Sequence, residues 1–138
     1  MSQSRGTMEF SNVESQMNLA PQMHYNRLIE VSRKSGIYTA WLSGNPYCLY
    51  VGKAGNLYNR IKSHYSGHRG GDQFCLYIYD HYIYPDRPPG LNTLAVDRIT
   101  GAWIKQNISF KYVEVPSEEM GIHEDRLRRE WNPILNPI

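Results

Sequence analysis

The segment Gly36–Gly67 reads GIYTAWLSGNPYCLYVGKAGNLYNRIKSHYSG, and its pattern predicts a β-hairpin followed directly by a short helix. Residues 37–42 and 47–51 are rich in β-branched, aromatic and aliphatic side chains, and the turn formers of residues 43–46 separate them. Asn56 is a suitable N-cap for the helix that follows. Apolar residues then recur every four positions and predict its buried stripe: Leu57, Ile61 and Tyr65.

Polar residues flank this predicted stripe. Asn56, Arg60 and His64 also repeat every four positions, so we expect them to look outward on one face of the helix. Anions are favoured near helix N-termini. A cation and a titratable imidazole in this position indicate a site for a negatively charged group.

The basic residues of the chain gather around the same segment. The formal net charge is only +2 over 138 residues, which by itself indicates no partner. Between Glu30 and Asp72, however, there is no acidic residue. The basic residues in that interval are Arg33, Lys34, Lys53, Arg60, Lys62 and Arg69. The predicted site is therefore locally positive and suited to a polyanion, although ordinary solvated surfaces also carry such clusters.

Length and composition limit the class of protein. A chain of 138 residues with 41% hydrophobic residues predicts one folded domain with a modest core. No apolar run approaches the roughly 20 residues of a membrane span, so we expect no membrane partner. The isolated Cys48 and Cys75 are predicted to be buried free thiols, which favours a cytoplasmic, intracellular location. Residues 1–22 are polar and are predicted to form a loose, disordered tail.

The rest of the chain predicts a helix over residues 93–106, a strand over 110–115 and a last helix ending near residue 131. With the hairpin they give an α/β fold of the α+β type with an antiparallel sheet. Residues 72–91 stand out as an insertion. Their aromatic part, QFCLYIYDHYIY at 73–84, is β-like and predicts one or two strands.

The motifs GIY at 36–38 and YVG at 50–52 resemble the GIY-YIG nuclease family, with Val in a place where Ile is more usual. The resemblance covers the chain from about residue 35 to the C-terminus, apart from the insertion. We therefore expect a single domain of this type over residues 23–138. Further polar residues fit places in the family's pattern: Lys53, Arg60, His64, Glu124 and Asn136.

The resemblance implies a small central sheet of three antiparallel strands flanked by helices. It also implies a DNA endonuclease that depends on Mg²⁺ or Mn²⁺ and leaves 5′-phosphate and 3′-hydroxyl ends. The residues expected at the catalytic site are Tyr38, Tyr50, Lys53, Arg60, His64, Glu124 and Asn136.

Glu124 is the expected metal ligand, since Mg²⁺ often takes only one or two protein carboxylates. The ordinary alternative is a surface glutamate paired with Arg128 one helical turn later. Tyr38, with Tyr50 beside it, is the candidate general base. A phenol with a pKa near 10 is a poor base, but neighbouring cations would lower that pKa. The alternative is that both tyrosines only pack a strand.

The other site residues have simpler expected roles. Arg60 would hold the scissile phosphate, because its guanidinium fork suits phosphate oxygens. His64 would orient a tyrosine or shuttle a proton, unless it is a packed structural histidine. Lys53 would contact phosphate or tune Tyr38. Asn136 would pin the end of the chain near the site through side-chain hydrogen bonds.

Substrate binding is expected to involve basic residues outside the catalytic set. The nucleic-acid-binding candidates are Arg33, Lys34, Lys62, His68 and Arg69. Tyrosines of the insertion, Tyr79 and Tyr82 in particular, could stack on splayed bases; the alternative is an extra strand or hairpin that buries them. Two other functions remain open: a module that binds branched or single-stranded nucleic acid without cutting, and a protein-interaction domain that docks through the insertion.

Overall fold

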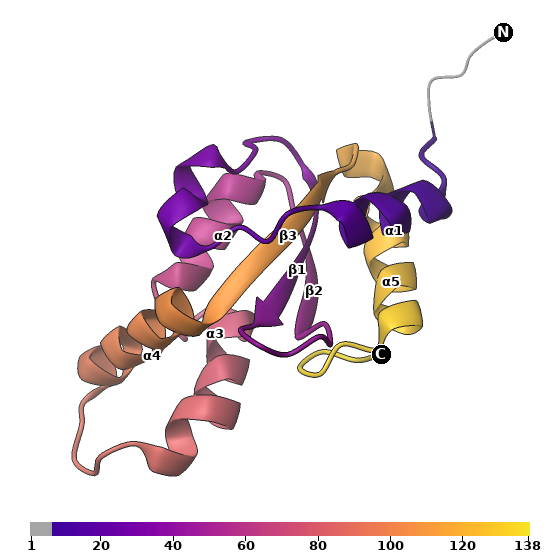
Figure 1. Cartoon of the computed structure of the whole chain (residues 1–138). Helices are drawn as coiled ribbons and strands as arrows, with labels where there is room; N and C mark the ends of the chain where they lie inside the picture. Colours follow the sequence, from indigo (N-terminus) through magenta and orange to yellow (C-terminus); the bar gives the residue numbers. More distant parts are fainter. Residues whose placement is uncertain (1–6) are drawn as a thin grey trace, which may run out of the picture.

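The computed structural model describes residues 7–138, and its centre is a three-stranded antiparallel sheet (Figure 1). The strand order is β2-β1-β3, so the first strand of the hairpin is the central one. The strands are β1 (Gly36–Leu42), β2 (Tyr50–Ala54) and β3 (Ile108–Glu114). The α-helices are α1 (Phe10–Leu19), α2 (Leu57–Tyr65), α3 (Gln73–Ile78), α4 (Thr93–Asn107) and α5 (Met120–Trp131). The predicted α+β fold with a three-stranded sheet is confirmed.

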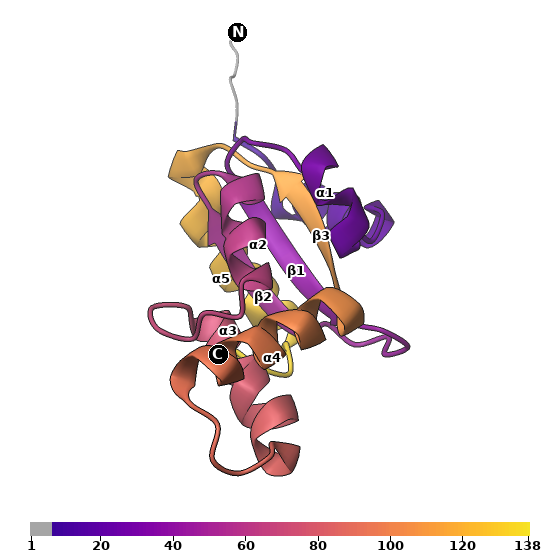
Figure 2. The ribbon, with the colours of Figure 1, turned by 90° about the vertical axis from the view of Figure 1, so that its left-hand side faces the viewer.

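Helices cover both faces of the sheet (Figures 1 and 2). Helices α2, α3 and α4 pack on the face that carries Tyr38 and Ala40, and α1 and α5 pack on the face that carries Ile37 and Trp41. Successive residues of a strand point to opposite faces, so β1 feeds both cores and is buried along almost its whole length. The central strand therefore positions groups toward either layer.

Both outer edges of the sheet are occupied by other parts of the chain. Met23 pairs with Phe110 on the free side of β3, exchanging two backbone hydrogen bonds. On the other edge, Ile134 N and Leu135 N donate to the carbonyl oxygens of Cys48 and Leu49, just ahead of β2. Covered edges prevent pairing with other chains. At the β2 edge, this cover also brings the C-terminus close to the candidate site.

The N-terminal region differs from the prediction. The tail predicted for residues 1–22 is wrong over α1, while residues 1–6 lie outside the described part of the chain. Val13 and Met17, four positions apart, are fully buried in the same core as Leu127 of α5. Trp131 of α5 also donates from Nε1 to the Glu14 carboxylate at 2.7 Å. These two apolar residues are enough to hold the helix in place, because the helix packs against a face of the sheet that would otherwise be exposed to water.

Truncating Met17 is expected to show that α1 belongs to the folded domain. Met17→Ala should lower the free energy of unfolding by about 2–5 kcal/mol, since it empties a fully buried position. Leu19→Ala is the matched control in the same helix, because Leu19 is 83% exposed. Urea unfolding followed by circular dichroism measures both. Equal midpoints for the two variants would contradict the packing of α1.

The insertion is helical, so the prediction of β-strands at residues 73–84 is wrong. Its segments are α3, the π-helical turn η2 (Tyr79–Ile83) and the 3₁₀ turn η3 (Tyr84–Asp86). The Asp72 side chain caps α3 by accepting from Cys75 N at 3.1 Å. Phe74, Cys75, Ile78 and Tyr79 are buried, which is the spacing of a helix face. Packing has overridden the β propensity of the aromatic residues.

Two further 3₁₀ turns stand in connecting segments. They are η1 (Tyr25–Glu30), before β1, and η4 (Ser117–Glu119), before α5. In the described part of the chain, no helix has both the length and the apolar character needed to cross a bilayer.

Candidate active site

Tyr38 and Tyr50 lie on the same face of the sheet, toward α2 and α3. Residues 43–49 separate the two strands, an odd number, and this parity places both tyrosines on one side. The register pairs Tyr38 with Gly52 and Tyr50 with Ala40, so the tyrosines are diagonal neighbours. Their ring centroids are 6.2 Å apart. The two motifs of the hairpin thus build one aromatic pair.

Gly52 makes room for the Tyr38 ring. A Cβ atom at this position would lie 2.5 Å from Tyr38 Oη, closer than any real Cβ contact. The hydroxyl of Tyr38 therefore crosses over β2 to reach α2, where it lies 2.6 Å from His64 Nε2. Glycine is therefore required at position 52, because any side chain there would clash with the Tyr38 ring.

Adding a methyl group at Gly52 is expected to displace that ring. Gly52→Ala should lower the free energy of unfolding by about 1–3 kcal/mol, because the site is overpacked. Gly55→Ala is the control, since a Cβ there meets no atom within 4 Å. Chemical denaturation of the two variants checks the difference. A Gly52→Ala protein as stable as Gly55→Ala would mean that Tyr38 has another low-energy position.

His64 is buried, and the prediction that it shares an exposed face with Arg60 is wrong. Only 2% of His64 is exposed, whereas Arg60 lies on the surface. Residues four apart on a helix are displaced by about 40° around its axis, because each turn takes about 3.6 residues. Over the eight positions from Asn56 to His64 this drift turns the side chain into the core beside Ile61 and Tyr65. Asn56 itself caps α2 as predicted, accepting from Asn59 N at 3.0 Å.

Both phenols are more difficult to ionise than free tyrosine, contrary to the prediction that cations lower their pKa. Burial raises the pKa of Tyr38 well above its usual value, and the neighbouring Tyr50 raises it further. Burial raises the pKa of Tyr50 to about 12. Arg60 acts in the opposite direction on both pKa values and is outweighed. Lys53 points to the other face of β2, where it pairs with Glu124. With both pKa values raised, the two tyrosines are neutral phenols near pH 7.

Arg60 is free to bind an anion. Its side chain lines a surface hollow of about 280 Å³ together with Asn56, Asn59 and Ser63 at the start of α2. It makes no ion pair within 4 Å anywhere in residues 7–138. A guanidinium fork beside a helix N-terminus suits phosphate oxygens.

Glu124 faces a second hollow on the other side of the end of β2. This hollow, of about 520 Å³, is also lined by Lys53, Gly121 and Asp125. The Glu124 carboxylate is partly buried, and its only ion pair within the described residues is a long one, 4.0 Å to Lys53 Nζ. Burial raises the pKa of Glu124, opposed by Lys53 and Arg128. The alternative pairing with Arg128 is not formed, because that guanidinium donates to the carbonyl oxygens of Asn136 and Pro137.

Asn136 binds the free edge of β2 through both ends of its side-chain amide. Its Oδ1 accepts from Val51 N at 3.1 Å, and its Nδ2 donates to Val51 O at 2.7 Å. Val51 lies between Tyr50 and Gly52, so the amide secures the motif strand from outside. These are side-chain hydrogen bonds of the kind expected for Asn136.

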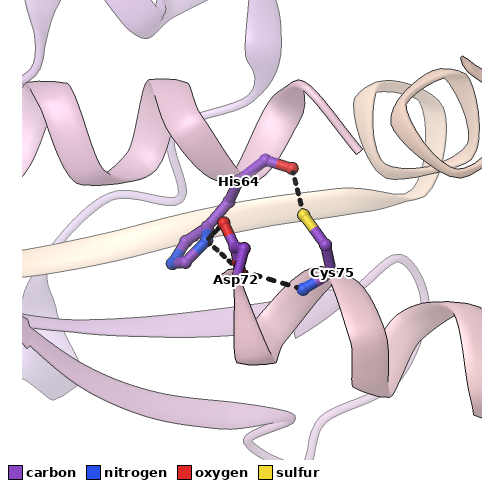
Figure 3. Close-up of side chains that lie close together, drawn as sticks. All are labelled: His64, Asp72 and Cys75. Atoms are coloured by element: carbon purple, nitrogen blue, oxygen red, sulfur yellow. Dashed lines mark hydrogen bonds and ion pairs between the residues drawn. The ribbon is translucent and has the colours of Figure 1, made fainter. Parts of the chain in front are cut away.

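Asp72 is a buried acidic residue that the sequence reasoning did not place in the site. Figure 3 shows its carboxylate against His64, with Oδ2 2.9 Å from His64 Nδ1, and Cys75 beside them. Burial raises the pKa of Asp72, but the hydrogen bonds from His64 and Cys75 act in the opposite direction and that pKa lies below its usual value. One signal was present in the sequence, since Asp72 is the first acidic residue after the basic interval. Its place as the N-cap of α3 could not be read there, because the following residues have the composition of a strand.

The basic residues expected to bind nucleic acid divide into two groups. Lys34 and Lys62 are exposed, and Lys62 Nζ lies 5.7 Å from the centre of the Tyr58 ring. The other three have closer partners within the chain, although Arg33 and His68 are exposed as well. Arg33 lies over the Tyr58 ring at 3.8 Å, Arg69 Nε donates to Asp97 at 2.6 Å, and His68 Nδ1 is 3.5 Å from the same carboxylate. The loop before α3 is therefore held to α4, and its positive charge is partly neutralised.

The tyrosines of the insertion are used for packing, so the prediction that Tyr79 stacks on bases is wrong. Tyr79 is 8% exposed, and Arg69 covers its ring at 4.4 Å. Tyr82 stacks on Trp103 of α4 with ring centroids 4.9 Å apart. Tyr84 is exposed. The insertion thus packs Tyr79 and Tyr82 against the rest of the domain, as expected of scaffold, but it does so as a helix and leaves Tyr84 exposed.

Comparison with known proteins gives one similarity in structure. No family model and no curated protein matches the chain. Among solved structures, the chain is similar to the GIY-YIG N-terminal endonuclease domain of UvrC from Thermotoga maritima, a point mutant bound to its catalytic divalent cation. The identity is 16%, the TM-score is 0.41, and the match covers 95% of this chain and 100% of the other. At this level of similarity, only the side chains of this chain can support a chemical role.

Proposed function

We propose that this protein is a metal-dependent DNA endonuclease of the GIY-YIG type. One observation carries the proposal. Arg60 and Glu124 come from helices on opposite faces of the sheet, yet the hollows that they line meet at the consecutive residues Lys53 and Ala54 of β2. Packing alone gives no reason to place a cation and a carboxylate beside the hairpin that carries both motif tyrosines.

Arg60 is proposed to bind the scissile phosphate. Its hollow and the Glu124 hollow flank the consecutive residues Lys53 and Ala54, so a phosphodiester lying across the end of β2 would reach both. Lys53, exposed on the Glu124 side, adds a second positive charge for the nucleic-acid backbone. Lys34 and Lys62 would extend this contact along the surface.

Glu124 fits the role of ligand to a divalent cation. Its carboxylate is partly desolvated and makes one long ion pair, so its oxygens remain available on the side of the hollow. Hard cations such as Mg²⁺ and Mn²⁺ accept such a carboxylate with water and phosphate oxygens as the other ligands. Bound there, the ion would stabilise negative charge on the phosphate during hydrolysis.

The base is proposed to be the hydrogen-bonded pair of Tyr38 and His64. A neutral phenol alone is a poor proton acceptor, but Tyr38 can accept a proton from water while it gives its own to an imidazole. Tyr50, adjacent to Tyr38 and half-buried, would orient the water or the phosphate. Asn136 holds the strand that carries Tyr50 by its bonds to Val51.

Incubation with supercoiled plasmid tests the proposal. Purified protein should nick or linearise the DNA with Mg²⁺ or Mn²⁺, should be inactive in EDTA, and should regain activity when excess ion is restored. End analysis should find 5′-phosphate and 3′-hydroxyl groups. Binding of plasmid or forked DNA without cleavage under all of these conditions would instead support a non-cleaving binding module.

A further inference from the structure

A buried chain of hydrogen bonds extends from Tyr38 through His64 to Asp72. Tyr38 Oη lies 2.6 Å from His64 Nε2. On the other side of the ring, His64 Nδ1 lies 2.9 Å from Asp72 Oδ2 (Figure 3). The exposed fractions of the three residues are 2%, 2% and 6%. They come from β1, α2 and the first residue before α3, so the insertion supplies the last member.

The chemistry of the three groups determines where each hydrogen lies. The ionised Asp72 carboxylate can only accept, so His64 Nδ1 carries a hydrogen and donates it. The Nε2 atom of a neutral imidazole then has a free lone pair, and Tyr38 Oη donates to it. Tyr38 Oη keeps lone pairs with which it can accept a further hydrogen bond.

Asp72 is itself held in place by the helix that it caps. Its carboxylate accepts from Cys75 N at 3.1 Å and from Ser63 Oγ at 3.4 Å, in addition to His64. The first turn of α3 therefore fixes the carboxylate relative to α2. The insertion therefore contributes to the site through Asp72. None of its tyrosines lines the hollow of Arg60 or the hollow of Glu124.

His64, Asp72 and Cys75 also have the composition of a metal site, with ligand atoms within 4.8 Å of one another. The hydrogen bonds favour a different interpretation. The Cys75 thiol donates to the His64 carbonyl oxygen at 3.2 Å, and His64 Nδ1 is used by Asp72. Burial also raises the pKa of that thiol, which opposes the thiolate that a metal requires.

We propose that Asp72 is a positioning residue that holds His64 in the tautomer able to accept a proton from Tyr38. The proposal rests on the proposed nuclease function. A water oxygen attacks phosphorus and its proton passes to Tyr38 Oη, while the Tyr38 proton passes to His64 Nε2. The P–O3′ bond breaks, and the 3′ oxygen leaves with the electron pair and takes a proton from solvent. The imidazolium beside the Asp72 carboxylate then returns its proton to solvent.

The variant Asp72→Asn separates this role from that of a helix cap. Asn is as good an N-cap as Asp, so Oδ1 can still accept from Cys75 N and α3 should persist. The Asn amide nitrogen, in the place of Oδ2, would donate to His64 Nδ1 and favour the tautomer with its hydrogen on Nε2, which leaves no acceptor for Tyr38. The remaining oxygen, Oδ1, lies 3.1 Å from Nδ1 but already accepts from Cys75 N. In Ser-His-Asp sites this kind of change costs about 10⁴ in rate through the wrong tautomer.

We expect Asp72→Asn to lower the single-turnover rate on plasmid with Mg²⁺ by on the order of 10²-fold or more, with DNA affinity and cooperative unfolding retained. Long-range ¹H–¹⁵N spectra should show His64 with its hydrogen on Nδ1 in the wild type and on Nε2 in the variant. Asp72→Ser, which also caps a helix but lacks the carboxylate, is the second variant and should lose rate similarly. Cys75→Ala is the matched control and should cleave at the wild-type rate.

Three results would overturn the proposal. Asp72→Asn cleaving at the wild-type rate, while EDTA abolishes cleavage, would refute it and leave the nuclease function standing. Stoichiometric zinc in the purified protein that is lost in Cys75→Ala would assign His64 Nδ1 to a metal. A wild-type protein that cleaves with neither Mg²⁺ nor Mn²⁺ would remove the proposed function and this role together.

Discussion

Glu124→Gln should abolish metal-dependent cleavage while leaving the fold intact, with a rate at least about 10³-fold below the wild type. A metal ion contributes several kcal/mol to such a reaction, and about 1.4 kcal/mol corresponds to a tenfold change in rate. Glutamine keeps the shape of the side chain but lacks the negative charge that a hard cation requires. Single-turnover cleavage of plasmid with Mg²⁺ measures the effect, and DNA affinity should change little.

Asp125→Asn is the matched control, because Asp125 lies next to Glu124, lines the same hollow and undergoes the same change of charge. It is exposed and pairs with Arg129 at 3.3 Å, so its replacement should leave the rate near that of the wild type. Equal loss in both variants would mean that the hollow acts through its net charge. Wild-type activity in Glu124→Gln would place the metal elsewhere.

The same substitution has a consequence for stability in EDTA. Burial raises the pKa of Glu124, so the folded protein holds that proton to higher pH than the unfolded chain does. Stability is therefore lost as the pH rises through the unfolded and then the folded pKa, and the ionised carboxylate is unfavourable near neutral pH. Glu124→Gln removes this effect, so its free energy of unfolding should equal or exceed that of the wild type at pH 7.

Arg60→Ala is expected to lower the cleavage rate by on the order of 10²–10³-fold, the usual effect of removing one group that stabilises charge in a transition state. The side chain is exposed and has no ion pair within residues 7–138, so stability should change by less than about 0.5 kcal/mol. Saturating DNA in a single-turnover assay separates the loss of rate from any loss of affinity.

Lys62→Ala controls for the loss of a positive charge on the same helix. Lys62 is exposed and lies 5.7 Å from the Tyr58 ring, outside the hollow that Arg60 lines. Its removal should weaken DNA binding slightly and reduce the salt dependence of binding, without changing the rate at saturation. If Lys62→Ala and Arg60→Ala lose rate equally, Arg60 contributes only to the general positive field.

Local patterns were sufficient to predict several elements of this protein. Tyr38 and Tyr50 stand on the two strands predicted for the hairpin, although only the observed strand ends show that an odd number of residues separates the strands and places both tyrosines on one face. Asn56 caps α2, whose stripe of Leu57, Ile61 and Tyr65 is buried as predicted. These features depend on interactions between residues close in sequence, and such interactions leave a period or a cap that can be read directly.

Other features depended on contacts between distant parts of the chain. The aromatic run at 73–84 has the composition of a strand but becomes a helix, because Asp72 caps it and α4 offers a surface for Tyr82. Helix α1 looks too polar to fold alone, and its place is determined by the uncovered face of the sheet. In both cases tertiary packing outweighs a local preference of small size.

The sequence by itself determined which residue types are available for phosphodiester chemistry: the two motif tyrosines, Arg60, His64 and Glu124. Only the tertiary structure decided their states. Desolvation by the surrounding core keeps both tyrosines protonated, where neighbouring basic residues in the sequence suggested the opposite. The position of His64 around the axis of α2 turns its side chain into the core, and the insertion places Asp72 against it. Burial and hydrogen-bond partners arise from segments far apart in the chain, so no local pattern could have shown them.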